Sequence, residues 1–284
     1  MRAALLAFVF VVMAGCSNNL PKQSIVDKLR VLAVQANPTE LVIADTLPAA
    51  TLNALAIEPS GAPIQLQWAL CPLPANLPPP ASLDCPGSHG IALPQDGNSV
   101  ARLDLADPST QPFWDVLYRT PDGTPLTDEQ RASTLSAGTT AVAGFSATAG
   151  GEELDGFAQV PLRSAGAPIN HNPSLIGLLV NGAELPADGS GVLHAGVKVR
   201  LQPVPASDAK EDTGNGLEAL NFSFFATDGD ISSLRSTDQT STGEPADSSI
   251  DYTAPNTTGS VRLWVVIRDG RGGVGWITRT AQVR

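Results

Sequence analysis

Short runs in which apolar and polar residues alternate recur along the 284-residue chain, and they constrain its fold more than any other feature. In the run 64–71, Ile64, Leu66 and Trp68 fall on one face of an extended chain, and the residues between them fall on the other. Glycine (26 residues) and proline (24 residues) are abundant and spread along the chain, as the turns of a β-protein require. The sequence therefore predicts an all-β protein.

The strand candidates fall into two modules, which we predict to be two β-sandwiches in tandem. The first module covers residues 28–165, and the second covers residues 174–284. Between them, residues 166–173 are polar and contain two prolines, which is typical of a linker. Both modules begin near an Asn-Pro pair and later carry an aromatic-bearing strand, which suggests a repeated fold. Strands are expected at 28–35, 50–57, 64–71, 100–105, 140–147 and 156–162, and then at 175–180, 197–203, 220–226, 249–253, 260–268 and 274–283.

One stretch of the first module departs from the strand pattern. Residues 113–118 and 126–135 do not alternate, and Thr127 stands three residues before Gln130, as in a capping box. The sequence therefore predicts a short helical insertion in the first module, with a helix that begins near Thr127.

The first 15 residues have the features of a secretory signal peptide. Arg2 supplies positive charge, and residues 3–13 form an unbroken apolar run. This run is shorter than the roughly 20 apolar residues that a membrane-spanning helix needs, but it suits a signal-peptide core. Residues 16–27 would then be a short polar tether.

The string Met13-Ala14-Gly15-Cys16 resembles the lipobox of bacterial lipoproteins. The resemblance implies cleavage after Gly15 and lipid modification of Cys16, with palmitate among its acyl chains. Several acyl chains are needed because one chain binds a membrane only marginally. In the sorting rule for such lipoproteins, an aspartate after the cysteine favours retention in the inner membrane. This chain has Ser17 at that position, so the rule favours the outer membrane. The alternative is an ordinary secretory leader in which Cys16 is incidental.

Two further cysteines, Cys71 and Cys85, predict a disulfide. An even remainder of cysteines in an exported chain indicates pairing. The enclosed segment is rich in proline and cannot pair in a sheet, so a covalent staple would hold it. Closing a loop of about 15 residues contributes about 3 kcal/mol in the chain-entropy model. A zinc site is the alternative, but two cysteines without nearby histidines do not make a ligand set.

The second module resembles bacterial immunoglobulin-like domains of the PKD and cadherin type. The resemblance rests on residues 221–230 (NFSFFATDGD), 251–255 (DYTAP) and 261–273 (VRLWVVIRDGRGG). The first module carries it more weakly, through Gln67-Trp68 after a Pro-Ser-Gly turn. The resemblance implies a spacer, adhesion or ligand-binding role rather than an enzyme, and a fold alone does not determine function.

No residue pattern indicates catalysis. Residues 270–275 satisfy GxGxxG, but a strand rather than a helix follows, so we interpret them as a hairpin turn. Ser146 lacks the second glycine of a nucleophile elbow. The three histidines show no metal-ligand spacing. We therefore predict no catalytic residues.

A calcium site of the cadherin type is a weaker hypothesis. Asp228 and Asp230 begin a segment like a calcium loop, and Asp269 could join them at the edge of the module. The loop lacks the glycine and glutamate of an EF-hand. The alternative is ordinary turn chemistry, because aspartate and glycine are the preferred turn residues, and this is the favoured interpretation. No other cofactor is expected.

A binding face is a further hypothesis. Trp264 and Trp276 stand on adjacent strands and could share a sheet face with Arg262 and Arg268. Exposed tryptophan and arginine could stack on a sugar or bind a protein partner. The favoured alternative is that the neighbouring module or long side chains cover this face.

The net charge of −11 argues against nucleic acid as a partner, because an acidic chain repels phosphate. Together these features favour a non-enzymatic, lipid-anchored envelope protein that presents binding or spacer modules. A glycan- or calcium-binding accessory protein of the envelope is the second hypothesis, and a hydrolase of envelope polymers is the third. With the tether at the first module, the second module would point outward.

Overall fold

The computed structural model describes residues 22–284 except 45, 73–84, 88, 98, 121, 167 and 215. The predicted signal peptide, lipobox and Cys16 lie outside the described residues. Within the described part, the chain forms four β-sheets and three short helical segments. None of these helices has the length and apolar character that a bilayer span requires.

The first module is a sandwich of two sheets. One sheet has the order β1-β3-β7-β6, and the other has the order β2-β9-β8-β4-β5. Trp68 and Phe145 meet in its core, with ring centroids 5.1 Å apart, among buried aliphatic residues of both sheets. The strands are β1 (Arg30–Asn37), β2 (Leu41–Ile43), β3 (Ala49–Ile57), β4 (Gln65–Cys71), β5 (Ile91–Ala92), β6 (Gln95–Asp96), β7 (Val100–Asp104), β8 (Thr139–Ala149) and β9 (Glu152–Ser164).

The second module is a sandwich of the same kind. Its sheets have the orders β11-β10-β13-β17-β15 and β12-β19-β18-β14-β16. Phe222, Phe224 and Tyr252 are fully buried between them. The strands are β10 (Leu175–Val180), β11 (Ala183–Glu184), β12 (Gly191–Leu193), β13 (Lys198–Pro205), β14 (Asn221–Ala226), β15 (Asp230–Ile231), β16 (Arg235–Thr237), β17 (Ile250–Thr253), β18 (Gly259–Arg268) and β19 (Val274–Val283).

The two modules share one topology. In each module the first strand, β1 or β10, pairs with the next long strand, β3 or β13. Between these two strands in the chain, a short strand, β2 or β12, belongs to the other sheet. That short strand, β2 or β12, runs parallel to the end of the last strand, β9 or β19, whereas the other paired strands of the two modules are antiparallel. This is the layout of immunoglobulin-like sandwiches, with one sheet from the first, second and fifth strands and the other from the third, sixth and seventh. The predicted all-β, tandem immunoglobulin-like fold is confirmed.

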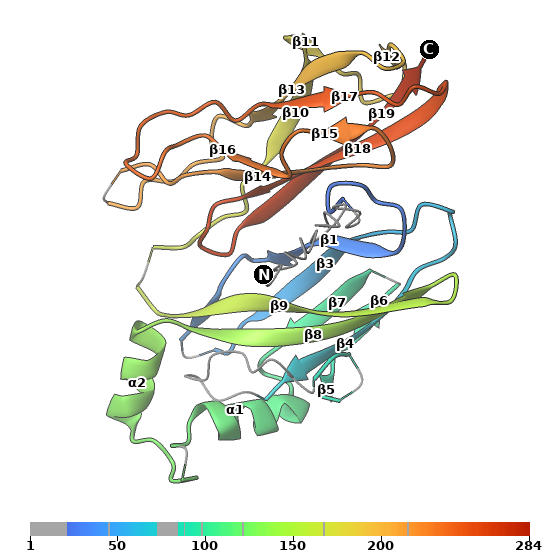
Figure 1. Ribbon diagram of the computed structural model, residues 1–284. Helices are drawn as coiled ribbons and strands as arrows, with labels where there is room; N and C mark the ends of the chain where they lie inside the picture. The colour runs from blue at the N-terminus through green and yellow to red at the C-terminus, as the bar shows by residue number, and fades with distance from the viewer. Residues whose placement is uncertain are drawn as a thin grey trace, which may run out of the picture.

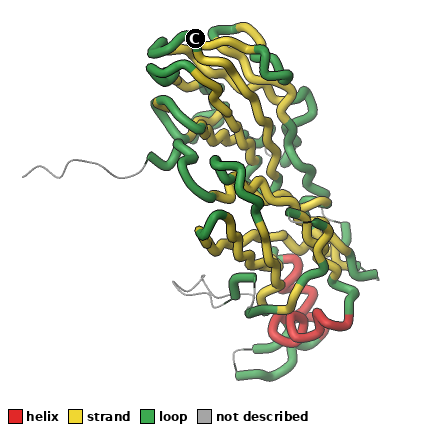
Figure 2. The backbone as a smooth tube through the Cα atoms, turned by 90° about the vertical axis from the view of Figure 1, so that its right-hand side faces the viewer, coloured by secondary structure: helices red, strands yellow, loops and turns green. Residues whose placement is uncertain are grey.

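The helical insertion lies in the first module, between β7 and β8. It holds a 3₁₀ turn (Pro108–Thr110), α1 (Gln111–Leu117) and α2 (Asp128–Ser136). The capping box at Thr127 is present: the main-chain N–H of Thr127 donates to Gln130 Oε1 (2.9 Å), and the N–H of Gln130 donates to Thr127 Oγ1 (3.3 Å). Figure 2 shows the helices at the end of the molecule opposite the C-terminus.

The predicted disulfide between Cys71 and Cys85 is present, with the Cα atoms 5.6 Å apart. It fastens a strap, made of the described residues 85–87, 89 and 90, across the outer face of β4 and β8. The approach is close enough to require glycine, because a Cβ on Gly144 would lie 1.9 Å from the carbonyl oxygen of Cys85, and one on Gly87 would lie 2.0 Å from that of Gln67. The staple therefore covers the outside of a sheet as well as closing a loop.

The two modules pack face to face, so that the sheets stack in layers (Figure 1). The outer face of β1 and β3 meets the outer face of β14, β18 and β19 in an apolar contact that we call the junction. Its buried members are Val26, Leu32, Ala33, Leu55, Trp264 and Val266.

The residues before β1 also differ from the free polar tether that the sequence suggested. Ile25 forms a parallel bridge with Ala226 of β14, and Val26 is 0% exposed. Lys22 forms an ion pair with Asp230 at 2.6 Å. Because Ile25 and Val26 are apolar, residues 22–26 pack onto the second module instead of standing in solvent.

The segment between the modules is bonded to both of them. Asn170 is 3% exposed; its main-chain N–H donates to Glu40 Oε1 (3.0 Å), and its side chain donates to Asp269 Oδ2 (2.8 Å). Asn172 donates to the carbonyl oxygen of Ala36 (2.7 Å) and accepts from the N–H of Val274 (2.9 Å). These hydrogen bonds resist a hinge motion between the modules, because breaking any of them would leave a polar group without its partner.

Candidate functional site

The tryptophan and arginine face predicted on the last two strands is mostly covered by the first module. Trp264 is 1% exposed within the junction, and Trp276 is half-buried there. Arg262 stays exposed, with its guanidinium 6.0 Å from the centre of the Trp264 ring. The alternative interpretation, coverage by the neighbouring module, therefore holds for Trp264. Sequence alternation identified the face correctly but could not show what packs on it.

Arg268 forms hydrogen bonds across the junction and is not a free cation on an exposed face. Its Nη2 donates to the carbonyl oxygen of Leu32 (3.0 Å), and its Nη1 donates to Ser223 Oγ (3.3 Å). Burial lowers the pKa of the guanidinium, and the charge of Arg235 adds to this effect. The side chain thus bonds the edge strand β1 of the first module to the second module.

The three aspartates of the calcium hypothesis are not brought together. Asp228 follows the end of β14, whereas Asp269 follows the strand residue that pairs with the start of β14. Six strand residues separate these ends by roughly 15–20 Å. Asp230 pairs with Lys22, and among the described residues no group of three acidic, histidine or cysteine side chains could hold a metal ion.

Asp269 instead organises the hairpin and the linker. Its side chain is buried and accepts from the N–H groups of Arg271 (2.7 Å) and Gly273 (2.9 Å), besides Asn170. Arg271 lies 3.0 Å from Glu218 and also pairs with Glu211. Sequence reasoning missed this polar cluster, because its members are far apart in the chain and none belongs to a motif.

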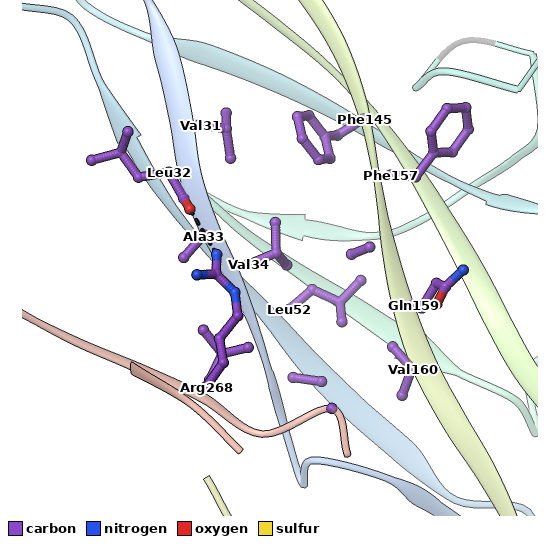
Figure 3. A pocket seen from close by; sticks show the side chains of 14 residues that line it. Val31, Leu32, Ala33, Val34, Leu52, Phe145, Phe157, Gln159, Val160 and Arg268 are labelled. Atoms are coloured by element: carbon purple, nitrogen blue, oxygen red, sulfur yellow. Dashed lines mark hydrogen bonds between the residues drawn. The ribbon is translucent and has the colours of Figure 1, made fainter. Parts of the chain in front are cut away.

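A cleft of about 350 Å³ lies beside the junction, along the side of the first sandwich. Figure 3 shows Val34 and Leu52 between the ribbon of β1 and that of β9, with Arg268 below. The first module contributes Val31, Val34, Leu52, Phe145, Phe157 and Val160, and the second contributes Arg268, Gly272 and Val274. The cleft is therefore lined by core side chains that the sandwich leaves open between two edge strands.

A second hollow of about 320 Å³ continues the cleft along β1. The two share Val31 and Leu32, and the second also has Leu154 of β9 and Phe225 of β14 in its lining. At the rim of the first, Phe157 is 41% exposed, which is unusual for a large apolar side chain. The sequence placed Phe157 in a strand but gave no sign that it would lack a neighbour.

The side chains that line the cleft are mostly apolar. The described residues that line it include no carboxylate, histidine, cysteine or hydroxyl side chain. They offer apolar walls, the polar side chains of Gln159 and Arg268, and the main chain of strand edges, which can hold a ligand but do not include a nucleophile or general base.

The likenesses of this chain to known proteins are weak. No protein-family model matches the sequence, and no curated protein matches it. Among solved structures, the D00–D0 domain of intimin is 9% identical, with a TM-score of 0.26 over 90% of this chain and 98% of that chain. Adhesin InvE of Yersinia pseudotuberculosis is 10% identical, with a TM-score of 0.24 over 90% of this chain and 60% of that one.

A nucleoside hydrolase-related hypothetical protein from Saccharophagus degradans is 18% identical, with a TM-score of 0.27; the match covers 41% of this chain and 26% of that chain. Likenesses of this strength identify neither a ligand nor an activity. The strand order itself defines the class: a pair of immunoglobulin-like domains joined face to face.

Proposed function

We propose that this protein is a non-enzymatic, lipid-anchored component of the cell envelope that presents its two immunoglobulin-like modules as one rigid binding body. The lipobox at Met13–Cys16 supports the anchor, and the cleft, lined by apolar side chains, Gln159, Arg268 and main chain, supports binding rather than catalysis. The observation that carries the proposal is the junction, which buries Trp264 and Val266, together with the hydrogen bonds of Asn170 and Asn172 to both modules.

The start of the described chain gives the anchored body an orientation. Lys22 and Val26 lie against the second module, so the chain leaves the body beside the junction. From Cys16 to Lys22 the chain reaches at most about 20 Å. In the proposed arrangement both modules stand beside the membrane, and this replaces the expectation that the second module points outward.

Metabolic labelling with an alkyne analogue of palmitate tests the anchor. We expect the full-length protein to take up the label and to sediment with membranes, and the Cys16→Ser variant to lose both properties. Ser17→Ala serves as a matched control and should be labelled as the wild type is. A wild-type protein that stays unlabelled and leaves the membrane fraction would rule out the anchor. Separation of the two membranes then tests the outer-membrane location that Ser17 favours.

A further inference from the structure

Among the described residues, one edge of β9 has no partner strand over most of its length. β2 pairs only with Leu162–Ser164, so Glu152–Pro161 has β8 on one side alone. Gly150 and Gly151 form the two-residue turn from β8, both with positive φ, and the turn closes on the pair Ala149 and Glu152.

The alternation of an antiparallel ladder then decides which main-chain groups are free. It directs the N–H and C=O groups of Glu153, Asp155, Phe157 and Gln159 away from β8. Pro161 falls in the same set. Proline has no N–H to donate, so it is tolerated at a position where no neighbouring strand would accept that bond. This edge borders the cleft.

The second module offers an internal comparison, because β19 is the counterpart of β9. Leu162 is the first residue of β9 that pairs with β2, and Ala281 is the first residue of β19 that pairs with β12, so these two residues correspond. Counting back by the same number of residues along each strand aligns Gly156 with Gly275 and Phe157 with Trp276. In the second module this edge is occupied by the linker. The N–H of Val274 donates to Asn172 (2.9 Å), and a Cβ on Gly275 would lie 2.1 Å from the carbonyl oxygen of Pro173.

In the first module the corresponding segment goes elsewhere. Residues 24–26, which precede β1, bond to Ala226 of the second module. In the second module, Asn172 and Pro173 fill the space beside β19. The corresponding space in the first module, beside β9, is the cleft. Phe157 is exposed there, whereas its counterpart Trp276 is half-buried in the junction.

We propose that the cleft binds an extended segment of a partner protein, which adds as a strand to the free edge of β9. The opposite strand, β1, is less available, because the carbonyl oxygens of Leu32 and Ala36 already accept from Arg268 and Asn172. Alternate side chains of the added strand enter the cleft towards Leu52 and Phe145. The inference rests on the proposed binding function but is independent of the lipid anchor.

Charge decides the chemistry of the occupant. Glu153 and Asp155 are exposed on the free edge, in a chain of net charge −11. A second copy that paired β9 with β9 would bring these acidic rows together, and like charges across a strand pair are destabilising. The edge therefore fits a segment with apolar residues at alternate positions and lysine or arginine between them.

The test uses the soluble chain that starts at residue 16, with Cys16→Ser, and a fluorescein-labelled peptide KVTVKV. We expect saturable binding by fluorescence anisotropy, and slower hydrogen exchange in the β9 residues 153–159 when the peptide is bound. Phe157→Ala should weaken binding about tenfold. Ile176→Ala, which removes an exposed apolar side chain from β10, is the matched control and should leave binding unchanged.

Charge reversal gives an independent result. Glu153→Lys should weaken binding of KVTVKV and strengthen binding of the peptide EVTVEV. No binding of KVTVKV, or binding without slower exchange in β9, would overturn the proposal. Self-association that Phe157→Ala abolishes would also overturn it and would assign the edge to a second copy. These outcomes are distinct from failure of the proposed anchor, which palmitate labelling measures on its own.

Discussion

At the scale of single residues, close packing explains identities that no motif predicts. Gly144 stands in the middle of β8, where glycine is unfavourable, and the strap that the disulfide fastens occupies the space that its side chain would need. Asp269 was a calcium candidate in the sequence, but it holds a hairpin and the linker. In both cases the partner is far away in the chain, and local sequence patterns carry no information about it.

Gly144→Ala tests the fit of the strap. The added Cβ would lie 1.9 Å from the carbonyl oxygen of Cys85, so the strap or the strand must move. Overpacking of this kind costs about 1–3 kcal/mol, and we expect that loss in the free energy of unfolding, measured in urea. Thr148→Ala, at an exposed position of the same strand, should change it by less than about 0.5 kcal/mol. Equal stabilities of the two variants would show that the strap does not lie on β8.

The buried carboxyl of Glu218 predicts a pH dependence. Burial raises its pKa, and the N–H of Glu211 and the charge of Arg271 oppose this only in part. The folded state then keeps a proton that the unfolded chain has lost, so this group lowers stability as pH rises from 4.5, its ordinary pKa, to the raised value. Above that value the loss is complete.

Glu218→Gln should remove this contribution. Between about pH 4 and pH 7, the free energy of unfolding of the variant should fall less than that of the wild type. Glu244→Gln changes an exposed glutamate of the same module and should leave the pH profile unaltered. If the profiles of Glu218→Gln and the wild type were parallel, the carboxyl would have the same pKa in the folded and unfolded states.

At the scale of strands and helices, the disulfide strap is the element with the clearest energetic role. It lies over Ala69 and Val142, on the outer face of the sheet that contains β4 and β8. In the second module, the corresponding sheet face is covered by the first module. Replacing Cys71 and Cys85 together by alanine should lower the free energy of unfolding by about 3 kcal/mol, since the closed loop has about 15 residues. Urea unfolding with and without a reductant measures the same loss in the wild type; unchanged midpoints would contradict it.

The long strands and the capped helix were predictable because each carries its signal locally. The alternation in Gln65–Cys71 and the capping box at Thr127 depend on a few neighbouring residues. Short edge strands such as β2 and β12 were not predicted, because two or three paired residues leave no periodic pattern. Most of the residues that line the cleft were predicted in strands, but the gap itself depends on the position of residues 22–26.

At the scale of the whole molecule, the packing of the modules is the main departure from the sequence-based expectation. The sequence, with a tether at the first module and a polar linker, suggested that the second module points outward, with Trp264 exposed on it or covered by its neighbour. The junction instead joins two sheet faces, and the linker and the start of the chain are bonded across it. One arrangement therefore accounts for the buried tryptophan, the rigid linker and the open cleft.

Small-angle X-ray scattering of the soluble Cys16→Ser chain tests this arrangement most directly. Four sheets stacked about 10 Å apart place the centres of the modules roughly 20 Å apart. We therefore predict a radius of gyration of about 18–20 Å, the value for a single compact body of this length, and a distance distribution with one maximum. A radius of about 24 Å or more, with a two-lobed distribution, would indicate modules placed end to end and would contradict the junction.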